Sequence, residues 1–142
     1  MPTPIVSTAG TVWNGDLFAG SGTTTLQSSG VGTFPVTWKA RSEDHGGLTS
    51  PEELIAAALS ACYPMQLSLE LAQNGTPPDR LDASAAVTFV AGAGITGIAL
   101  TVTGHVPGIA AEDFARVAAS AKDNCPVSGA LAVEITLTAS LA

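Results

Sequence analysis

The chain has 142 residues, of which 46% are hydrophobic and only 12% are charged, and its formal net charge is −7 at pH 7. Twelve acidic residues against five basic ones argue against nucleic acid and against an anionic membrane surface as partners, because both need clustered lysine and arginine. Globular chains usually carry about 25% charged residues. We therefore expect part of this surface to be covered by a second subunit.

The length fits a single domain over residues 1–142, which can bury a core without disulfide staples. The opening stretch, MPTPIVSTAG, has neither the basic region nor the apolar run of a signal peptide. We therefore expect a cytoplasmic protein. In a reducing compartment, the two cysteines are expected to be reactive, metal-binding or inert rather than permanently bridged.

The first forty residues predict a meander of about three short strands, because threonine and glycine alternate there with aromatic and β-branched residues. Residues 13–16, Trp-Asn-Gly-Asp, carry an Asn-Gly turn signal between two extended runs. Residues 23–27 and 34–40 are typical of further strands. The polar segment 41–49 contains two consecutive glycines and is predicted to be a loop.

A long helix is predicted to begin after residue 50. Ser50 is a suitable N-cap, Pro51 suits the first helical position, and the two glutamates that follow favour the positive end of the helix dipole. Residues 54–65 carry no charge on any face, which is typical of a helix that is buried all round. The pair Asn74-Gly75 predicts the end of the helix.

The second half of the chain predicts alternating strands and helices. Apolar residues at every second position indicate strands, spacing of three and four indicates a helix, and Cys125-Pro126 stops that helix. The predicted order is βββ-α-ββ-α-β, an α+β domain. Its later elements are strands over 81–90 and 95–106, a helix over 110–124, one more helical turn over 127–131, and a last strand over 133–141.

The two cysteines are the first candidates for chemistry. From its helix alone, Cys62 is more simply a small buried hydrophobic residue. Cys125 ends a helix. There it has two equally good interpretations: a small residue that suits a helix end, or a thiol that can approach another sulfur. A reactive thiolate needs a nearby cation, and Arg41 precedes the Cys62 helix. Its guanidinium can hold a thiolate and a carboxylate such as Glu52, although each residue taken alone has a simpler solvated role.

A zinc site built from the cysteines with His45 and His105 has poor support, because no pair falls at the usual ligand spacing. The chain also lacks a GxGxxG motif, a phosphate loop and a GxSxG motif. We therefore expect no metal ion.

Two stretches resemble the OsmC/Ohr family of thiol-dependent peroxidases: TSPEELIAAALSACYPMQLSLEL (residues 49–71) and DNCPVSGALAVEITL (residues 123–137). TVWNGDLFAGSGT (residues 11–23) and VPGI (residues 106–109) resemble its OsmC branch. The resemblance spans nearly the whole chain. It implies an intertwined homodimer whose sheets wrap around central helices, with two active sites at the dimer interface.

By position, the resemblance implies that Cys62, ten residues after Glu52, is the peroxidatic cysteine and that Cys125 of the CPVS motif is the resolving cysteine. Arg41 matches the arginine that stabilises the thiolate, and Glu52 would hold Arg41. The implied enzyme is an antioxidant peroxidase that reduces organic hydroperoxides through a sulfenic acid and an intramolecular disulfide. A dithiol or a lipoylated protein would serve as the external reductant, and no cofactor is implied.

Two other functions stay open: a module of the same fold that binds an apolar ligand or senses redox state without turnover, and a structural domain with inert thiols. The chain also departs from the family pattern, with Tyr63 where phenylalanine is common and Pro64 where a small residue is usual. The added hydroxyl of Tyr63 needs a partner. Because a proline disfavours helical geometry at the preceding residue, we predict a kink just after Cys62.

Overall fold

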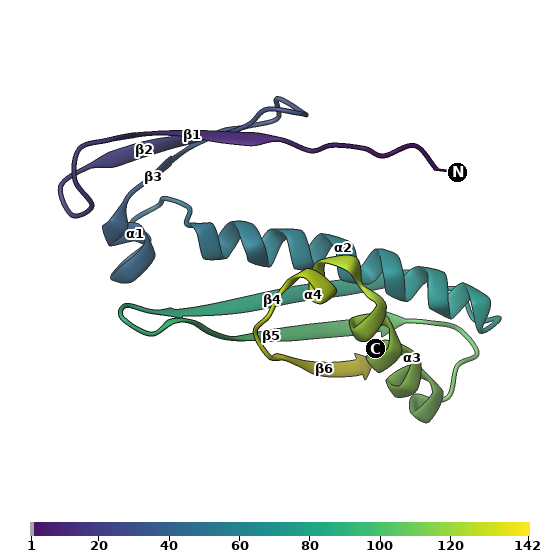
Figure 1. Cartoon of the computed structure of the whole chain (residues 1–142). Helices are drawn as coiled ribbons and strands as arrows, with labels where there is room; N and C mark the ends of the chain where they lie inside the picture. The colour runs from purple at the N-terminus through teal and green to yellow at the C-terminus, as the bar shows by residue number, and fades with distance from the viewer. Residues whose placement is uncertain (1) are drawn as a thin grey trace. The chain divides into compact units, whose positions relative to one another are not determined.

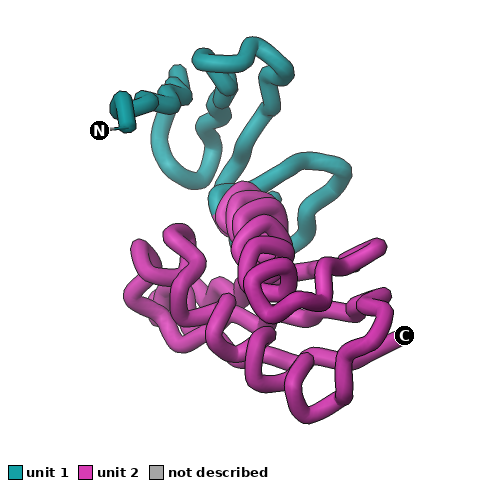
Figure 2. The backbone as a smooth tube through the Cα atoms, turned by 90° about the vertical axis from the view of Figure 1, so that its right-hand side faces the viewer, with its two compact units in different colours: residues 1–51 teal, residues 52–142 magenta. Residues whose placement is uncertain are grey.

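The computed structural model describes residues 2–142 and divides into two compact units, residues 1–51 and 52–142 (Figures 1 and 2). The first unit is a small sheet followed by a short helix, and the second is a sheet packed with helices. The order of the long elements confirms the predicted α+β class. The prediction of one domain over the whole chain stays a prediction.

The first unit contains the predicted meander of three antiparallel strands, β1 (Ala9–Asn14), β2 (Ser21–Leu26) and β3 (Thr33–Val36), with β2 in the centre. Gly15 follows β1 with a φ of 92°, a left-handed conformation that glycine adopts without steric cost. This agrees with the turn signal of the Asn-Gly pair. Threonine hydroxyls on neighbouring strands hydrogen-bond across the sheet, Thr11 with Thr24 and Thr25 with Thr33.

A short helix, α1 (Trp38–Ser42), follows β3 and corrects two predictions. The strand predicted over 34–40 ends at Val36, and the loop predicted from residue 41 begins after a helical turn. The physical reason is a cap: the Thr37 hydroxyl accepts a hydrogen bond from the Ala40 amide at 3.1 Å. The aromatic and β-branched residues around Thr37 favoured a strand in the sequence, and the cap overrides that preference.

The second unit is built on a three-stranded sheet with β5 in its centre. β4 pairs with β5 in antiparallel register and β6 pairs with it in parallel register. A parallel pair needs a crossover connection, which α3 and α4 supply. The elements of this unit are α2 (Pro51–Gln73), β4 (Arg80–Val90), β5 (Gly94–His105), α3 (Ala111–Asn124), α4 (Pro126–Ala130) and β6 (Ile135–Leu141). All of them were predicted within two residues at each end.

The core of the second unit joins one face of the sheet to one stripe of α2 and one stripe of α3. α2 contributes a residue every turn, β5 contributes every second residue, and α3 contributes residues at helical spacing. Each of these side chains is at most 4% exposed. The cluster consists of Leu59, Tyr63, Leu67, Leu71, Ile98, Leu100, Val102, Phe114, Val117, Ala118, Ala121 and Cys125.

α2 continues through Pro64 and Tyr63 is helical, so the proline does not end the helix, and the kink predicted just after Cys62 stays a prediction. A proline inside a helix removes one hydrogen-bond donor and crowds the preceding turn. Leu59, Tyr63 and Leu67, on either side of the proline, are fully buried in the core, which holds the helix together. The helix ends as predicted, because the amides of Gly75 and Thr76 return to the carbonyls of Ala72 and Leu71 in a Schellman motif.

The opposite face of α2 is exposed within the described chain, although the sequence predicted a helix buried all round. Met65 is 72% exposed and Leu69 is 51% exposed. By length and composition alone α2 could cross a bilayer. One stripe of it packs in the core of the second unit.

The contact between Gly104 of β5 and Phe114 of α3 gives a test of this packing. A Cβ atom on Gly104 would lie 2.6 Å from the Phe114 Cζ atom. We therefore expect Gly104→Ala to lower the free energy of unfolding by about 1–3 kcal/mol, since the buried ring has little room to move. Gly97→Ala on the same strand is the matched control, because its Cβ would meet no atom within 4 Å. Urea denaturation of both variants would contradict this packing if they unfolded at the same midpoint.

Candidate active site

The two cysteines face each other within the second unit. Cys62 lies in the middle of α2, and Cys125 lies between α3 and α4. Their Sγ atoms are 3.1 Å apart, and both are free thiols. A disulfide bond is about 2.05 Å long, so the sulfurs need to approach by only about 1 Å to form one. The structure thus brings together two residues that are 63 positions apart in the sequence.

The backbone around Cys125 is held on both sides. Its amide donates to the Ala121 carbonyl at 2.9 Å, and its carbonyl accepts from the Gly129 amide at 3.0 Å. Cys125 itself is extended, with φ −63° and ψ 122°, because the residue before a proline avoids the helical region. This one non-helical residue turns the chain from α3 into α4 and directs the thiol toward α2.

The two thiols differ in access and in acidity. Cys62 is half-buried, whereas Cys125 is 1% exposed. Burial raises the pKa of the Cys62 thiol. Burial also acts to raise the pKa of Cys125, but hydrogen bonds from the Ser128 amide and from Cys62 outweigh it and lower that pKa. Within this unit the first negative charge is therefore favoured on Cys125, with the remaining proton on Cys62.

Tyr63 finds the partner that its extra hydroxyl requires. The hydroxyl donates to the Ala118 carbonyl of α3 at 2.9 Å, and the side chain is fully buried. Burial, with a smaller contribution from the negative charge of Glu70, raises the pKa of the Tyr63 phenol, so it remains a donor at neutral pH. Tyr63 thus ties α2 to α3 one residue after Cys62.

A polar cluster, which sequence reasoning missed, ties the same two helices nearer the end of α3. One carboxylate oxygen of Glu70 accepts from the Ser120 hydroxyl and from the Asn124 side-chain amide, both at 2.8 Å. Asn124 also donates to the Ser120 hydroxyl at 3.3 Å. A signal for it was present, since Glu70 is the one charged residue between positions 54 and 71.

The other two predicted site residues belong to different units, Arg41 to the first and Glu52 to the second. Glu52 is in the first turn of α2 and is 5% exposed. Arg41 is in α1 of the first unit, where its guanidinium carbon lies 6.0 Å from the centroid of the Trp38 ring, a cation–π distance. Because Arg41 and Cys62 belong to different units, the predicted ion pair and thiolate contact stay predictions.

The two histidines do not join the cysteines. His45 lies in the exposed segment after α1, and His105 ends β5, with its Nε2 atom 3.6 Å from an Asp82 carboxylate oxygen. Among residues 2–142, no group of three histidine, cysteine or acidic side chains is placed to hold a metal ion.

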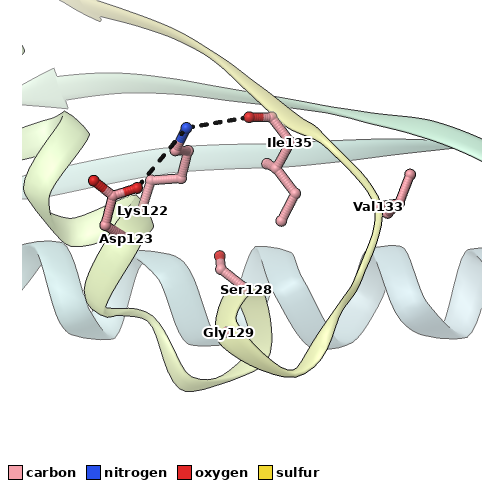
Figure 3. A pocket seen from close by; sticks show the side chains of 6 residues that line it. All are labelled: Lys122, Asp123, Ser128, Gly129, Val133 and Ile135. Atoms are coloured by element: carbon pink, nitrogen blue, oxygen red, sulfur yellow. Dashed lines mark hydrogen bonds and ion pairs between the residues drawn. The ribbon is translucent and has the colours of Figure 1, made fainter.

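A pocket of about 230 Å³ lies where the end of α3 and α4 face β6 (Figure 3). Across it the Lys122 ammonium donates to the Ile135 carbonyl at 3.2 Å and lies 4.0 Å from the Asp123 carboxylate. The bond to Ile135 joins the last turn of α3 to β6. The lining residues are Lys122, Asp123, Ser128, Gly129, Val133 and Ile135, and neither cysteine is among them.

Comparison with known proteins identifies the family. Residues 44–140 match the family model described as OsmC-like protein. The chain is 43% identical over 128 residues to the protein named Peroxiredoxin OsmC of Escherichia coli, covering 88% of this chain and 89% of that protein. The chain belongs to the OsmC family. The resemblance seen in the sequence is thereby confirmed.

Solved structures support the OsmC fold. An organic hydroperoxide resistance protein OsmC from Legionella pneumophila aligns with a TM-score of 0.71 at 20% identity, covering 99% of each chain. The organic hydroperoxide resistance protein OhrB of Bacillus subtilis aligns with a TM-score of 0.65 at 21% identity, covering 95% of this chain and 98% of that one. At these identities the likeness shows the fold alone.

The unequal acidity of the thiol pair predicts two separate ionisations in the reduced protein. The ordinary pKa of a cysteine thiol is 9.0. We expect the first proton to leave below this pH, mainly from Cys125, and the second to leave above it, mainly from Cys62. Thiolate absorbance at 240 nm, followed against pH, measures both steps. If both protons left in a single step near the ordinary thiol pKa, the predicted difference between the two cysteines would be contradicted.

Proposed function

We propose that this OsmC-family protein is a thiol-dependent peroxidase that reduces organic hydroperoxides to alcohols, with Cys62 as the peroxidatic and Cys125 as the resolving cysteine. The observation that carries the proposal is the 3.1 Å separation of the two sulfurs, one of them accessible and the other buried. The relative named Peroxiredoxin OsmC, which is 43% identical, supports the reaction class.

The proposed cycle has three steps. The Cys62 thiolate attacks one peroxide oxygen, the O–O bond breaks, and the alkoxide takes a proton and leaves as the alcohol. Cys62 is then a sulfenic acid. The Cys125 thiolate attacks that sulfur, the hydroxyl group leaves as water after it gains a proton, and a disulfide joins the two residues. A dithiol or a lipoylated protein then reduces the disulfide and becomes oxidised.

Arg41 and Glu52 complete the proposed site. Within the second unit, burial raises the pKa of Cys62, so this thiol needs a positive charge to become the attacking thiolate. We assign that charge to Arg41, whose guanidinium would bond the sulfur with one edge and the Glu52 carboxylate with the other. No metal, haem or other cofactor takes part in this proposal.

A homodimer is the assembly that we propose. Apolar side chains are exposed on α2 and throughout the first unit, whose described residues bury little more than Gly22, Ala40 and Ser50. Exposed apolar area of this kind is typical of a subunit interface. Together the two units would form one domain that interlocks with its copy. We place the protein in the cytoplasm, where thiol reductants are available.

The roles of the two cysteines can be separated by substitution. Cys62→Ser removes the attacking sulfur, so we expect loss of cumene hydroperoxide consumption with a dithiol reductant. Cys125→Ser leaves the sulfenic acid without its partner, so we expect Cys62 to progress to sulfinic acid. Peroxide assays and intact mass measure these outcomes. Retained turnover in Cys62→Ser would overturn the assignment.

The exposed face of α2 tests the dimer. Met65, at 72% exposure within the chain, would lie in the interface, so Met65→Glu is expected to bury a charge there and dissociate the dimer. Light scattering after size exclusion should give twice the 14.1 kDa chain mass for the unmodified protein and about half that value for the variant. An unmodified protein that is monomeric at micromolar concentration would contradict the dimer.

A further inference from the structure

Glu70 is an unusual residue for its position. It is the one charge among eighteen residues of α2, 54–71, and it stands next to Leu71, the last residue of the buried stripe. One of its carboxylate oxygens accepts the two hydrogen bonds from α3, and the other is buried without a hydrogen-bond partner. An arrangement that leaves a carboxylate oxygen unsatisfied costs free energy. Core stability alone therefore gives no reason for it.

The cluster acts on the one turn of α3 that carries Cys125. Ser120 and Asn124 lie four residues apart, so both face α2 from the last turns of the helix. Asn124 is covalently joined to Cys125. Helix ends fray, and a frayed last turn would let the Cys125 sulfur move away from Cys62. The bonds from Glu70 fix this turn to the helix on which Cys62 lies.

The negative sign of the Glu70 charge supports a role in positioning the end of α3. The carbonyl end of a helix carries partial negative charge, so a carboxylate beside the last turn of α3 is electrostatically unfavourable. Tyr63 and the apolar core already hold α2 against the body of α3. Glu70 adds a hydrogen bond to the side-chain amide of Asn124, which fixes the position of the final turn of α3.

We propose that Glu70, through Ser120 and Asn124, positions Cys125 so that it captures the oxidised Cys62 before a second peroxide does. The inference rests on the proposed function, because it concerns the step in which the Cys62 sulfenic acid becomes a disulfide. In that step Cys125 competes with peroxide, which would convert the same sulfenic acid to sulfinic acid. Glu70 touches neither peroxide nor sulfur and acts only through the backbone of α3.

An exchange of donor and acceptor tests the proposal. Asn124→Asp places a second carboxylate against Glu70, so the two side chains repel and the last turn loosens. Glu70→Gln keeps a carbonyl oxygen as acceptor for Ser120 and Asn124. In the double variant Glu70→Gln with Asn124→Asp, the glutamine amide donates to the new carboxylate, which restores the bond in reverse. Asp123→Asn changes an exposed charge in the same turn and is the matched control.

Two rates are measured in each variant after rapid mixing with cumene hydroperoxide: loss of the Cys62 thiol, and formation of the Cys62–Cys125 disulfide, both by acid quench and mass analysis. We expect Asn124→Asp to form the disulfide about fivefold more slowly and to raise the sulfinic fraction similarly, since one or two hydrogen bonds are lost. Its first step should stay unchanged. Glu70→Gln, the double variant and Asp123→Asn should behave like the unmodified protein.

The outcomes separate the two hypotheses. If the unmodified protein forms no disulfide with peroxide, the proposed function fails. If it forms one, and Asn124→Asp forms it equally fast, the positioning role of Glu70 is overturned. A double variant as slow as Asn124→Asp also contradicts the proposal, because the defect would then come from the new charge at the helix end. A melting temperature well above the assay temperature in every variant confirms that the rates do not reflect unfolding.

Discussion

The contact between the Cys62 and Cys125 sulfurs, at 3.1 Å, is the interaction on which the proposed chemistry of this protein depends. It exists because α2 and α3 pack on the same face of one sheet, and because α3 stops one residue before Cys125. The proline that follows prevents the helix from continuing and turns the thiol inward. The sheet, the two helices and the proline thus place Cys62 and Cys125, which are far apart in the sequence, close enough to form a disulfide.

Hydrogen bonds between α2 and α3 fix the relative position of the two helices, which apolar packing brings together. The Tyr63 hydroxyl bonds α3 near its middle, and Glu70 bonds its last turn. Packing of leucine and alanine surfaces permits small sliding movements, whereas a hydrogen bond is satisfied over a narrow range of distances. A reaction that closes a gap of about 1 Å between two sulfurs benefits from such restraint. The hydrogen bond to the Ala118 carbonyl explains why a tyrosine is tolerated beside Cys62.

Much of the fold could be predicted from the sequence, because its signals are local. The N-cap signal of Ser50, the Asn-Gly pair after α2 and the alternation along β4, β5 and β6 each depend on a few neighbouring residues. α1 could not be predicted, since the strand preference of its aromatic and β-branched neighbours conceals the Thr37 cap. Pro64 does not end α2, because burial of the residues around it holds the helix together.

The site was predictable only in part. Motif resemblance identified Cys62 and Cys125, while spacing along the chain could not have paired them. The cluster of Glu70, Ser120 and Asn124 joins residues about fifty positions apart and matched no motif, although a lone acid in an apolar helix was a visible signal. Which of the two thiols is more acidic depends on the amide of Ser128 and on burial, and both follow from the folded backbone.

The central claim is that one molecule of hydroperoxide, a two-electron oxidant, joins Cys62 to Cys125 within one chain. The most direct measurement is peptide mapping, without reduction, of protein treated with one equivalent of cumene hydroperoxide. The account predicts a chain that has lost the mass of two hydrogen atoms, with the Cys62 and Cys125 peptides linked and no bridge between chains. An oxygen added at Cys62 with Cys125 still a free thiol, or a bridge between two chains, would contradict it.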